Sequence, residues 1–209
     1  MSLSFPSATT LLLFAGTAFL LVIIPGPNMF FILSKGIVSG RRAAFASAFG
    51  VELGTLVHIV GTVVGISALL ASSPVAFNIL KYAGAAYLLY LAYRAARAPE
   101  SHLSETVPEQ SMLRTLGSAA LVNVLNPKVA LFFLALFPQF IAPDAVSVPS
   151  QALILGLVFF VIALLLDLLY ATGSVAVGRW LDHNPRFHLW QRVGSAATLV
   201  GLALFAALA

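Results

Sequence analysis

Long apolar stretches, separated by short polar connections, dominate the sequence. At about 20 helical residues for a hydrocarbon core about 30 Å thick, six of these stretches are long enough to cross a membrane. Their expected limits are 8–33, 43–70, 75–93, 115–141, 151–178 and 191–208. The run from Leu153 to Leu166 is apolar throughout and lacks the alternation of a barrel strand. The pattern therefore predicts an all-α, polytopic membrane protein with six transmembrane helices.

The composition supports this interpretation. Of the 209 residues, 60% are hydrophobic and 9% are charged, whereas a water-soluble domain carries roughly 25% charged residues. We therefore expect the lipid bilayer to be the main partner of the surface. The net charge of +4 is spread over short clusters, so no nucleic-acid partner is expected. The chain has no cysteine, which excludes disulfides and thiolate metal sites, and we expect neither a metal nor another cofactor.

Basic residues gather in alternate connections. Lys35, Arg41 and Arg42 fall between the first two spans, and further clusters follow the third and fifth spans. Because such residues favour the cytoplasmic side, the pattern predicts a multi-pass protein of the cell inner membrane with both termini outside. No Lys or Arg precedes the first span, so we expect it to be retained and not cleaved as a signal peptide.

The chain is expected to form a single membrane domain, 1–209. It divides into a first three-helix half (1–97), a cytoplasmic linker (98–113) and a second three-helix half (114–209). Three spans on either side of the linker give the halves opposite orientations, which is typical of inverted-repeat transporters. The sequence therefore predicts two inverted halves.

Matching positions of the two halves carry prolines and acids. The expected helix breaks are at Pro25, Gly26 and Pro27 in the first span and at Pro127 in the fourth, because proline lacks the N–H that a helix needs. The second span of each half carries one acid, Glu52 and Asp167. Depths estimated at about 1.5 Å per residue bring the breaks and the acids to one level, slightly cytoplasmic of the midplane.

Several of these motifs resemble those of the LysE/RhtB family of amino-acid exporters. They are the run Ile24 to Asn28, Gly40 to Ala44 followed by Gly50 and Gly54, the run Leu80 to Leu88, and the run Leu121 to Phe133. The resemblance implies efflux of amino acids or close derivatives, such as threonine, homoserine or homoserine lactone. It also implies that proton exchange drives the transport.

The polar residues expected at the breaks form the candidate substrate site. The set is Asn28, Glu52, Asn123, Asn126, Lys128, Asp167 and Tyr170. Lys128 would receive the carboxylate, the asparagines and Glu52 the ammonium group, and Asp167 the proton. Structural alternatives stay open: Asp167 and Lys128 as a static ion pair, Glu52 in the headgroup region, and the asparagines as helix caps. For His58 we expect a packed, hydrogen-bonded side chain and not a metal ligand.

The interpretation that these features favour is a secondary-active exporter of a small neutral amino acid or derivative, coupled to proton antiport by alternating access. An ion or divalent-metal exporter is the alternative, although two acids without cysteine make a poor divalent site. A membrane-embedded enzyme is a further alternative, but no HExxH motif is present, so no enzymatic activity is expected. Whether the chain forms a homo-oligomer is left open.

Overall fold

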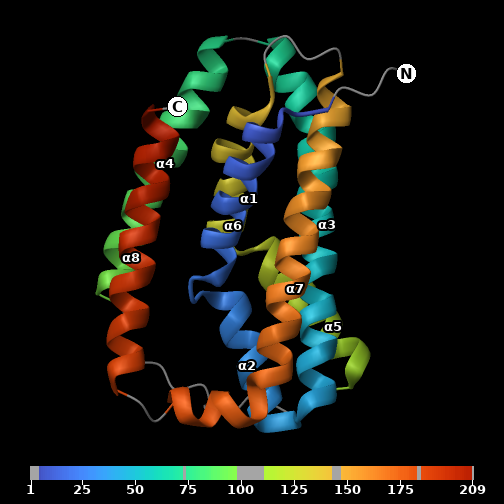
Figure 1. Ribbon diagram of the computed structural model, residues 1–209, viewed down its shortest axis with the longest axis vertical. Helices are drawn as coiled ribbons and strands as arrows, with labels where there is room; N and C mark the ends of the chain where they lie inside the picture. The colour runs from blue at the N-terminus through green and yellow to red at the C-terminus, as the bar shows by residue number, and fades with distance from the viewer. Residues whose placement is uncertain (1–4, 73, 98–110, 143–146, 183–184, 209) are drawn as a thin grey trace.

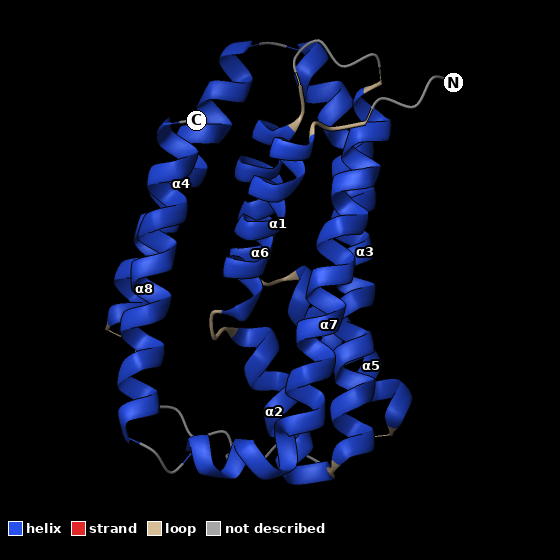
Figure 2. Ribbon diagram, in the orientation of Figure 1, coloured by secondary structure: helices blue, strands red, loops and turns tan. Residues whose placement is uncertain are grey.

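The computed structural model describes residues 5–72, 74–97, 111–142, 147–182 and 185–208, and every regular element in these ranges is helical (Figure 2). The elements are α1 (Ala8–Ile23), α2 (Pro27–Ser39), α3 (Arg41–Ser72), α4 (Pro74–Ala96), α5 (Met112–Val124), α6 (Pro127–Leu131), the π-helix η1 (Phe132–Leu136), the 3-10 helix η2 (Phe137–Phe140), α7 (Val148–Asp182) and α8 (Pro185–Leu208). The all-α class predicted from the sequence is confirmed.

Two helices are long and apolar enough to cross a membrane alone, over Arg41–Gly65 of α3 and Val148–Ala176 of α7. Two bent pairs also qualify: α1 with α2, bent by 49°, and α5 with Pro127–Phe140, bent by 47°. The described residues therefore contain two spans, or four if each bent pair is one span. Helices α4 and α8 have 23 and 24 residues, about the length a span needs. That they also cross the membrane stays a prediction.

Both bends occur at the predicted prolines. Ile24, just before Pro25, is extended with φ −74° and ψ 130°, because a residue that precedes proline avoids the helical region. Asn126, before Pro127, is likewise extended with φ −72° and ψ 109°. Pro27 and Pro127 then begin α2 and α6, where a helix does not need their missing N–H. Figure 1 shows both breaks near the middle of the bundle.

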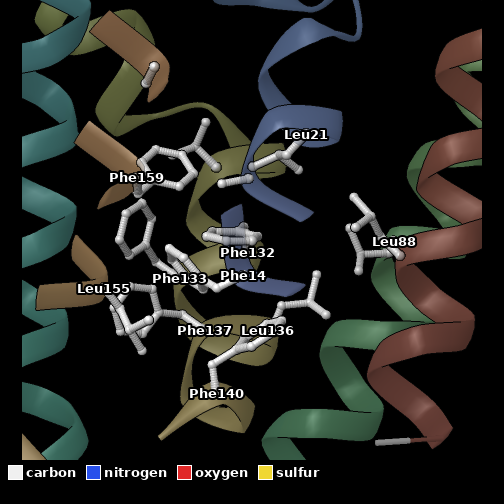
Figure 3. Close-up of a cluster of buried hydrophobic side chains, with 14 of the residues drawn as sticks. Phe14, Leu21, Leu88, Phe132, Phe133, Leu136, Phe137, Phe140, Leu155 and Phe159 are labelled. Carbon is white, nitrogen blue, oxygen red and sulfur yellow. The ribbon is translucent and has the colours of Figure 1, made fainter. Parts of the chain in front are cut away.

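Helices α3 and α7 organise the packing around these breaks. Helix α3 contacts α5 and α7, and α7 contacts α1 and α2, whereas α4 and α8 pack side by side at one side of the bundle (Figure 1). Figure 3 shows the largest buried cluster, whose aromatic members are Phe14, Phe132, Phe133, Phe137, Phe140 and Phe159. The outward faces of the helices carry many exposed Leu and Val side chains. Such faces suit contact with lipid.

The glycines of α3 have two different environments, although the helix periodicity places them on one face. A Cβ atom on Gly50 or Gly54 would collide with α5, whereas one on Gly61 or Gly65 would meet nothing within 4 Å. A close contact between glycines and a neighbouring helix therefore exists in the first part of α3 only. The reason is that α5 ends at Val124, so α3 continues without it.

Three further expectations concern the ends and the connections. Lys35 was expected in the first connection, but it lies in α2, fully buried, with its ammonium 5.7 Å from the Phe31 ring centroid. Residues 98–110 of the predicted linker lie outside the described residues. The start of α1 and the end of α8 lie at the same end of the bundle in Figure 1, and the side of the membrane they face stays a prediction.

Candidate functional site

A small cavity lies where the two breaks meet α3 and α7. Its volume is about 20 Å³, which is enough for about one water. Its polar lining consists of Asn28, Glu52, Thr55, Asn123, Lys128 and Asp167. Apolar side chains such as Leu21, Val51 and Phe159 complete the wall. The cavity is therefore a chamber with a mixed polar and apolar lining inside an apolar bundle, too small in this state for an amino acid.

Lys128 reaches from α6 to the end of α1. Its Nζ donates to the Leu21 carbonyl at 2.8 Å and to the Ile24 carbonyl at 3.0 Å. The N–H that would normally serve the Leu21 carbonyl belongs to residue 25, which is proline, so the ammonium replaces it. A Cβ on Gly26 would lie 3.1 Å from Nζ, a tight contact, so the ammonium passes close to the backbone at that position. An ammonium has three donors, and the described residues account for two.

Glu52 and Asp167 are the two buried acids of the cavity. Their side chains are 2% and 3% exposed, and their carboxyl groups lie close enough to interact electrostatically. Neither carboxyl oxygen of Glu52 has a hydrogen-bond partner among the described residues. Lys128 acts on Asp167 through its charge, but no direct ion pair joins the two side chains within the described part of the chain. Glu52 therefore offers unused acceptors to the cavity.

Three asparagines connect the breaks to α3. The Asn28 amide donates to Asn123 Oδ1 at 2.9 Å and accepts from the Asn126 amide at 3.0 Å. Asn123 Nδ2 donates to the Val51 carbonyl at 2.6 Å and to Thr55 Oγ1 at 2.9 Å. Asn126 Oδ1 also accepts from the Lys128 backbone N–H at 3.1 Å, which makes it the N-cap of α6. The network therefore holds α2, α3, α5 and α6 together.

Two aromatic residues lie just outside the cavity lining. The Tyr170 hydroxyl on α7 donates to the Ile23 carbonyl at 3.0 Å. His58 on α3 stacks on Phe133 with ring centroids 5.4 Å apart, and its Nε2 lies 3.2 Å from the Asn123 carbonyl. The expectation of a packed, hydrogen-bonded histidine is confirmed. Among the residues that the structure describes, no three His, Asp or Glu side chains gather in a way that could hold a metal ion.

Most of the candidate residues predicted from the sequence meet at this place. Asn28, Glu52, Asn123, Lys128 and Asp167 line the cavity with Gly26, whereas Asn126 lies behind Asn28, and Tyr170, Pro25, Pro27 and Pro127 are not part of the lining. Glu52 is well inside α3 and buried, away from the helix start considered as an alternative. Sequence reasoning missed Thr55. Its position three residues after Glu52, on the same helix face, is the signal that could have found it.

The sequence model described as "LysE type translocator" matches residues 19–209. The chain belongs to the LysE family. This confirms the resemblance seen in the sequence, and since the family is one of translocators, membership supports a transporter and not an enzyme. No solved structure matches the chain.

Curated relatives give the membership more detail. A homoserine/homoserine lactone efflux protein of Salmonella typhi is 38% identical over 196 residues, covering 91% of this chain and 93% of its own. A leucine efflux protein of an Enterobacter species is 34% identical over 144 residues, covering 66% of this chain and 67% of its own. An uncharacterized membrane protein of Vibrio cholerae is 35% identical over 167 residues, covering 79% and 80%. As a LysE family member with apolar helices, the chain is a membrane protein of an amino-acid exporter family.

Proposed function

We propose that this LysE family member exports a small neutral amino acid or derivative, of the threonine, homoserine or homoserine lactone class, in exchange for protons. The observation that carries the proposal is the chamber where two buried acids and one half-buried amine meet at two helix breaks. Charged groups within a membrane bundle are costly and typically mark a transport pathway. The efflux relatives support an amino-acid substrate.

The proposed architecture is a pair of inverted three-helix halves with six spans. Its support is the correspondence between halves: each begins with a span bent at proline, by 49° and 47°, and continues with a helix that carries one buried acid. Helix α3 packs against the broken span of the second half, and α7 against the broken span of the first. The cavity then lies between the halves, where transporters of this type bind their substrates.

Within the chamber, the substrate carboxylate would bind the third N–H of Lys128 and the N–H groups at the start of α2, which has no side-chain cap. The ammonium group would bind the Glu52 carboxylate, whose two oxygens lack partners among the described residues. Asn28 and Asn123 form part of the wall, with Asn126 behind Asn28, and their amides keep unused hydrogen-bonding capacity beyond their mutual bonds.

Asp167 is the proposed proton carrier. It is buried between Glu52 and Lys128, so a gain or loss of its proton changes the charge that the substrate ammonium meets. Protonation on the outer side and release on the cytoplasmic side would bring protons in while substrate leaves. Because the cavity holds about one water, substrate loading requires the halves to open. This supports alternating access. The proposal places the chain in the inner membrane with both termini outside, on the basis of the basic residues in alternate connections.

Counterflow into proteoliposomes tests the proposal. Purified protein, reconstituted with unlabelled threonine inside, should accumulate labelled threonine, homoserine or homoserine lactone, and an imposed pH gradient should drive net movement. Asp167→Asn should keep counterflow and lose the response to the gradient, while Thr172→Val, a change on the exposed face of α7, should keep both. Accumulation of none of a panel of neutral amino acids would refute the substrate class. A full pH response in Asp167→Asn would refute the coupling role.

A further inference from the structure

The three prolines at the breaks each leave one carbonyl without its helical donor. A helix pairs the carbonyl of residue i with the N–H of residue i+4, and proline has no N–H. Pro25, Pro27 and Pro127 therefore leave the carbonyls of Leu21, Ile23 and Asn123 without that donor, although the Asn123 carbonyl also accepts from the Asn126 backbone N–H at 3.0 Å. In a membrane such groups must be satisfied by other parts of the protein.

A side chain from the opposite half reaches every one of these carbonyls. Lys128 Nζ donates to Leu21 O at 2.8 Å, and the Tyr170 hydroxyl donates to Ile23 O at 3.0 Å; both donors belong to the second half and both carbonyls to the first. The third bond runs the other way. His58 Nε2, on α3, lies 3.2 Å from Asn123 O on α5. Since a carbonyl only accepts, the Nε2 atom carries the hydrogen in this bond.

We propose that Tyr170 and His58 are positioning residues for transport, which act together with the two carbonyl bonds of Lys128 to hold each broken helix in the shape that builds the cavity. The inference rests on the proposed function. It assigns a role to His58, which no charge or cavity contact suggests, and it makes the Tyr170 hydroxyl a donor to the backbone and not a substrate ligand. Leu21 and Asn123 both line the cavity, so moving either break changes the space that a substrate enters.

The arrangement differs from ordinary helix capping in one respect that matters for function. Every donor belongs to the half that does not contain the break, so each bond spans the interface across which the halves must move. Loss of a donor should therefore alter the distribution between cavity conformations as well as the stability of the fold. This separates a positioning role from a merely structural one.

Transport by two matched pairs of variants tests the donors. Tyr170→Phe removes the cross-half hydroxyl, and Thr172→Val removes a hydroxyl whose bond stays within α7, to the Leu168 carbonyl. His58→Leu removes the donor, and His58→Gln retains an N–H of similar reach. We expect Tyr170→Phe and His58→Leu to slow counterflow about 3- to 20-fold, the range for one hydrogen bond inside a membrane protein. Thr172→Val and His58→Gln should remain near the wild-type rate. Wild-type rates in both donor-free variants, or equal loss in His58→Gln and His58→Leu, would overturn the proposal.

A labelling measurement reads conformation without transport. The chain has no cysteine, so Ala163→Cys introduces a single thiol in the cavity wall, at a position that is 4% exposed. A positioning role predicts that adding Tyr170→Phe changes the rate of labelling by a water-soluble thiol reagent at least 3-fold without substrate, while adding Thr172→Val does not. An unchanged rate with Tyr170→Phe would favour direct substrate contact and overturn the proposal. If the wild-type chain moves no amino acid, the proposed function fails, and the labelling comparison still tests the donors.

Discussion

Replacement of single glycines on α3 gives a sharp test of how the helices pack. Gly54 and Gly61 lie on the same face of one helix, and both can be changed to alanine with the addition of one methyl group. At Gly54 the added Cβ would lie 2.7 Å from the Ala120 carbonyl oxygen and 2.8 Å from Asn123 Cβ. At Gly61 it would meet nothing within 4 Å. The two substitutions are chemically identical and differ only in what surrounds them.

The expected magnitudes follow from those distances. Ordinary van der Waals contact begins at 3.4 Å, so α5 would have to move by about 0.7 Å to relieve the contact at Gly54. Such overpacking costs typically 1–3 kcal/mol, and alanine returns roughly 0.5–1 kcal/mol as the better helix former. We therefore expect Gly54→Ala to lower the free energy of unfolding by up to about 2.5 kcal/mol. Gly61→Ala should raise it by about 0.5–1 kcal/mol.

Thermal unfolding of the purified protein in detergent measures both changes. For a chain of this length, about 1 kcal/mol corresponds to roughly 2–4 °C in Tm, so the two variants should differ by several degrees with opposite signs. Gly54→Ala should also slow transport, because the shift reaches the bonds from Asn123 to α3. Equal Tm changes in the two variants would refute the close approach of α3 and α5 on which the site geometry depends.

Three other substitutions have equally direct outcomes. Asn123→Asp replaces the Nδ2 group, which donates two hydrogen bonds, by an oxygen that faces the two acceptor oxygens. It should therefore lower the free energy of unfolding by about 1–3 kcal/mol. Asn78→Asp, at an exposed position of α4, should change that free energy by no more than about 0.5 kcal/mol. Glu52→Gln should raise the KM for counterflow about 10- to 100-fold by removing a charged acceptor, and an unchanged KM would argue against the ammonium site. Phe132→Ala, in the aromatic cluster, should lower the free energy of unfolding by about 3–5 kcal/mol. Leu113→Ala should change it little, because Leu113 is 82% exposed. Similar Tm values for the two variants would contradict the packing in Figure 3.

The order of the helices and the position of their breaks were predictable from local signals. Apolar runs give helices that must lie in lipid, and Pro25 and Pro127 interrupt a helix for reasons contained in the residue itself. The level shared by Glu52 and Asp167 follows from counting residues along straight helices. These inferences succeed because they depend only on the local sequence around each residue.

The partners of the site residues were not predictable in the same way. Charge alone suggested Asp167 as the partner of Lys128, but the ammonium binds the carbonyls that Pro25 and its neighbours leave available. The helical pairing of residue i with residue i+4 shows that Pro25 leaves the Leu21 carbonyl without its donor. Only the packing of α6 against α1 decides which other donor reaches it. Likewise, Gly54 and Gly61 are equivalent by periodicity and differ only because α5 ends between them. Contacts between distant segments carry this information.

The side chains that donate to a helix break in the opposite half also have a consequence for biosynthesis. A ribosome makes α1 and α2 before Lys128 and Tyr170 exist, so the first break enters the translocation machinery with two backbone acceptors that nothing yet serves. In the hydrocarbon core each would cost several kcal/mol. Final seating of the amino-terminal half must therefore wait for the carboxy-terminal half. A product truncated after α4 would expose this defect to the proteases that survey newly inserted membrane proteins.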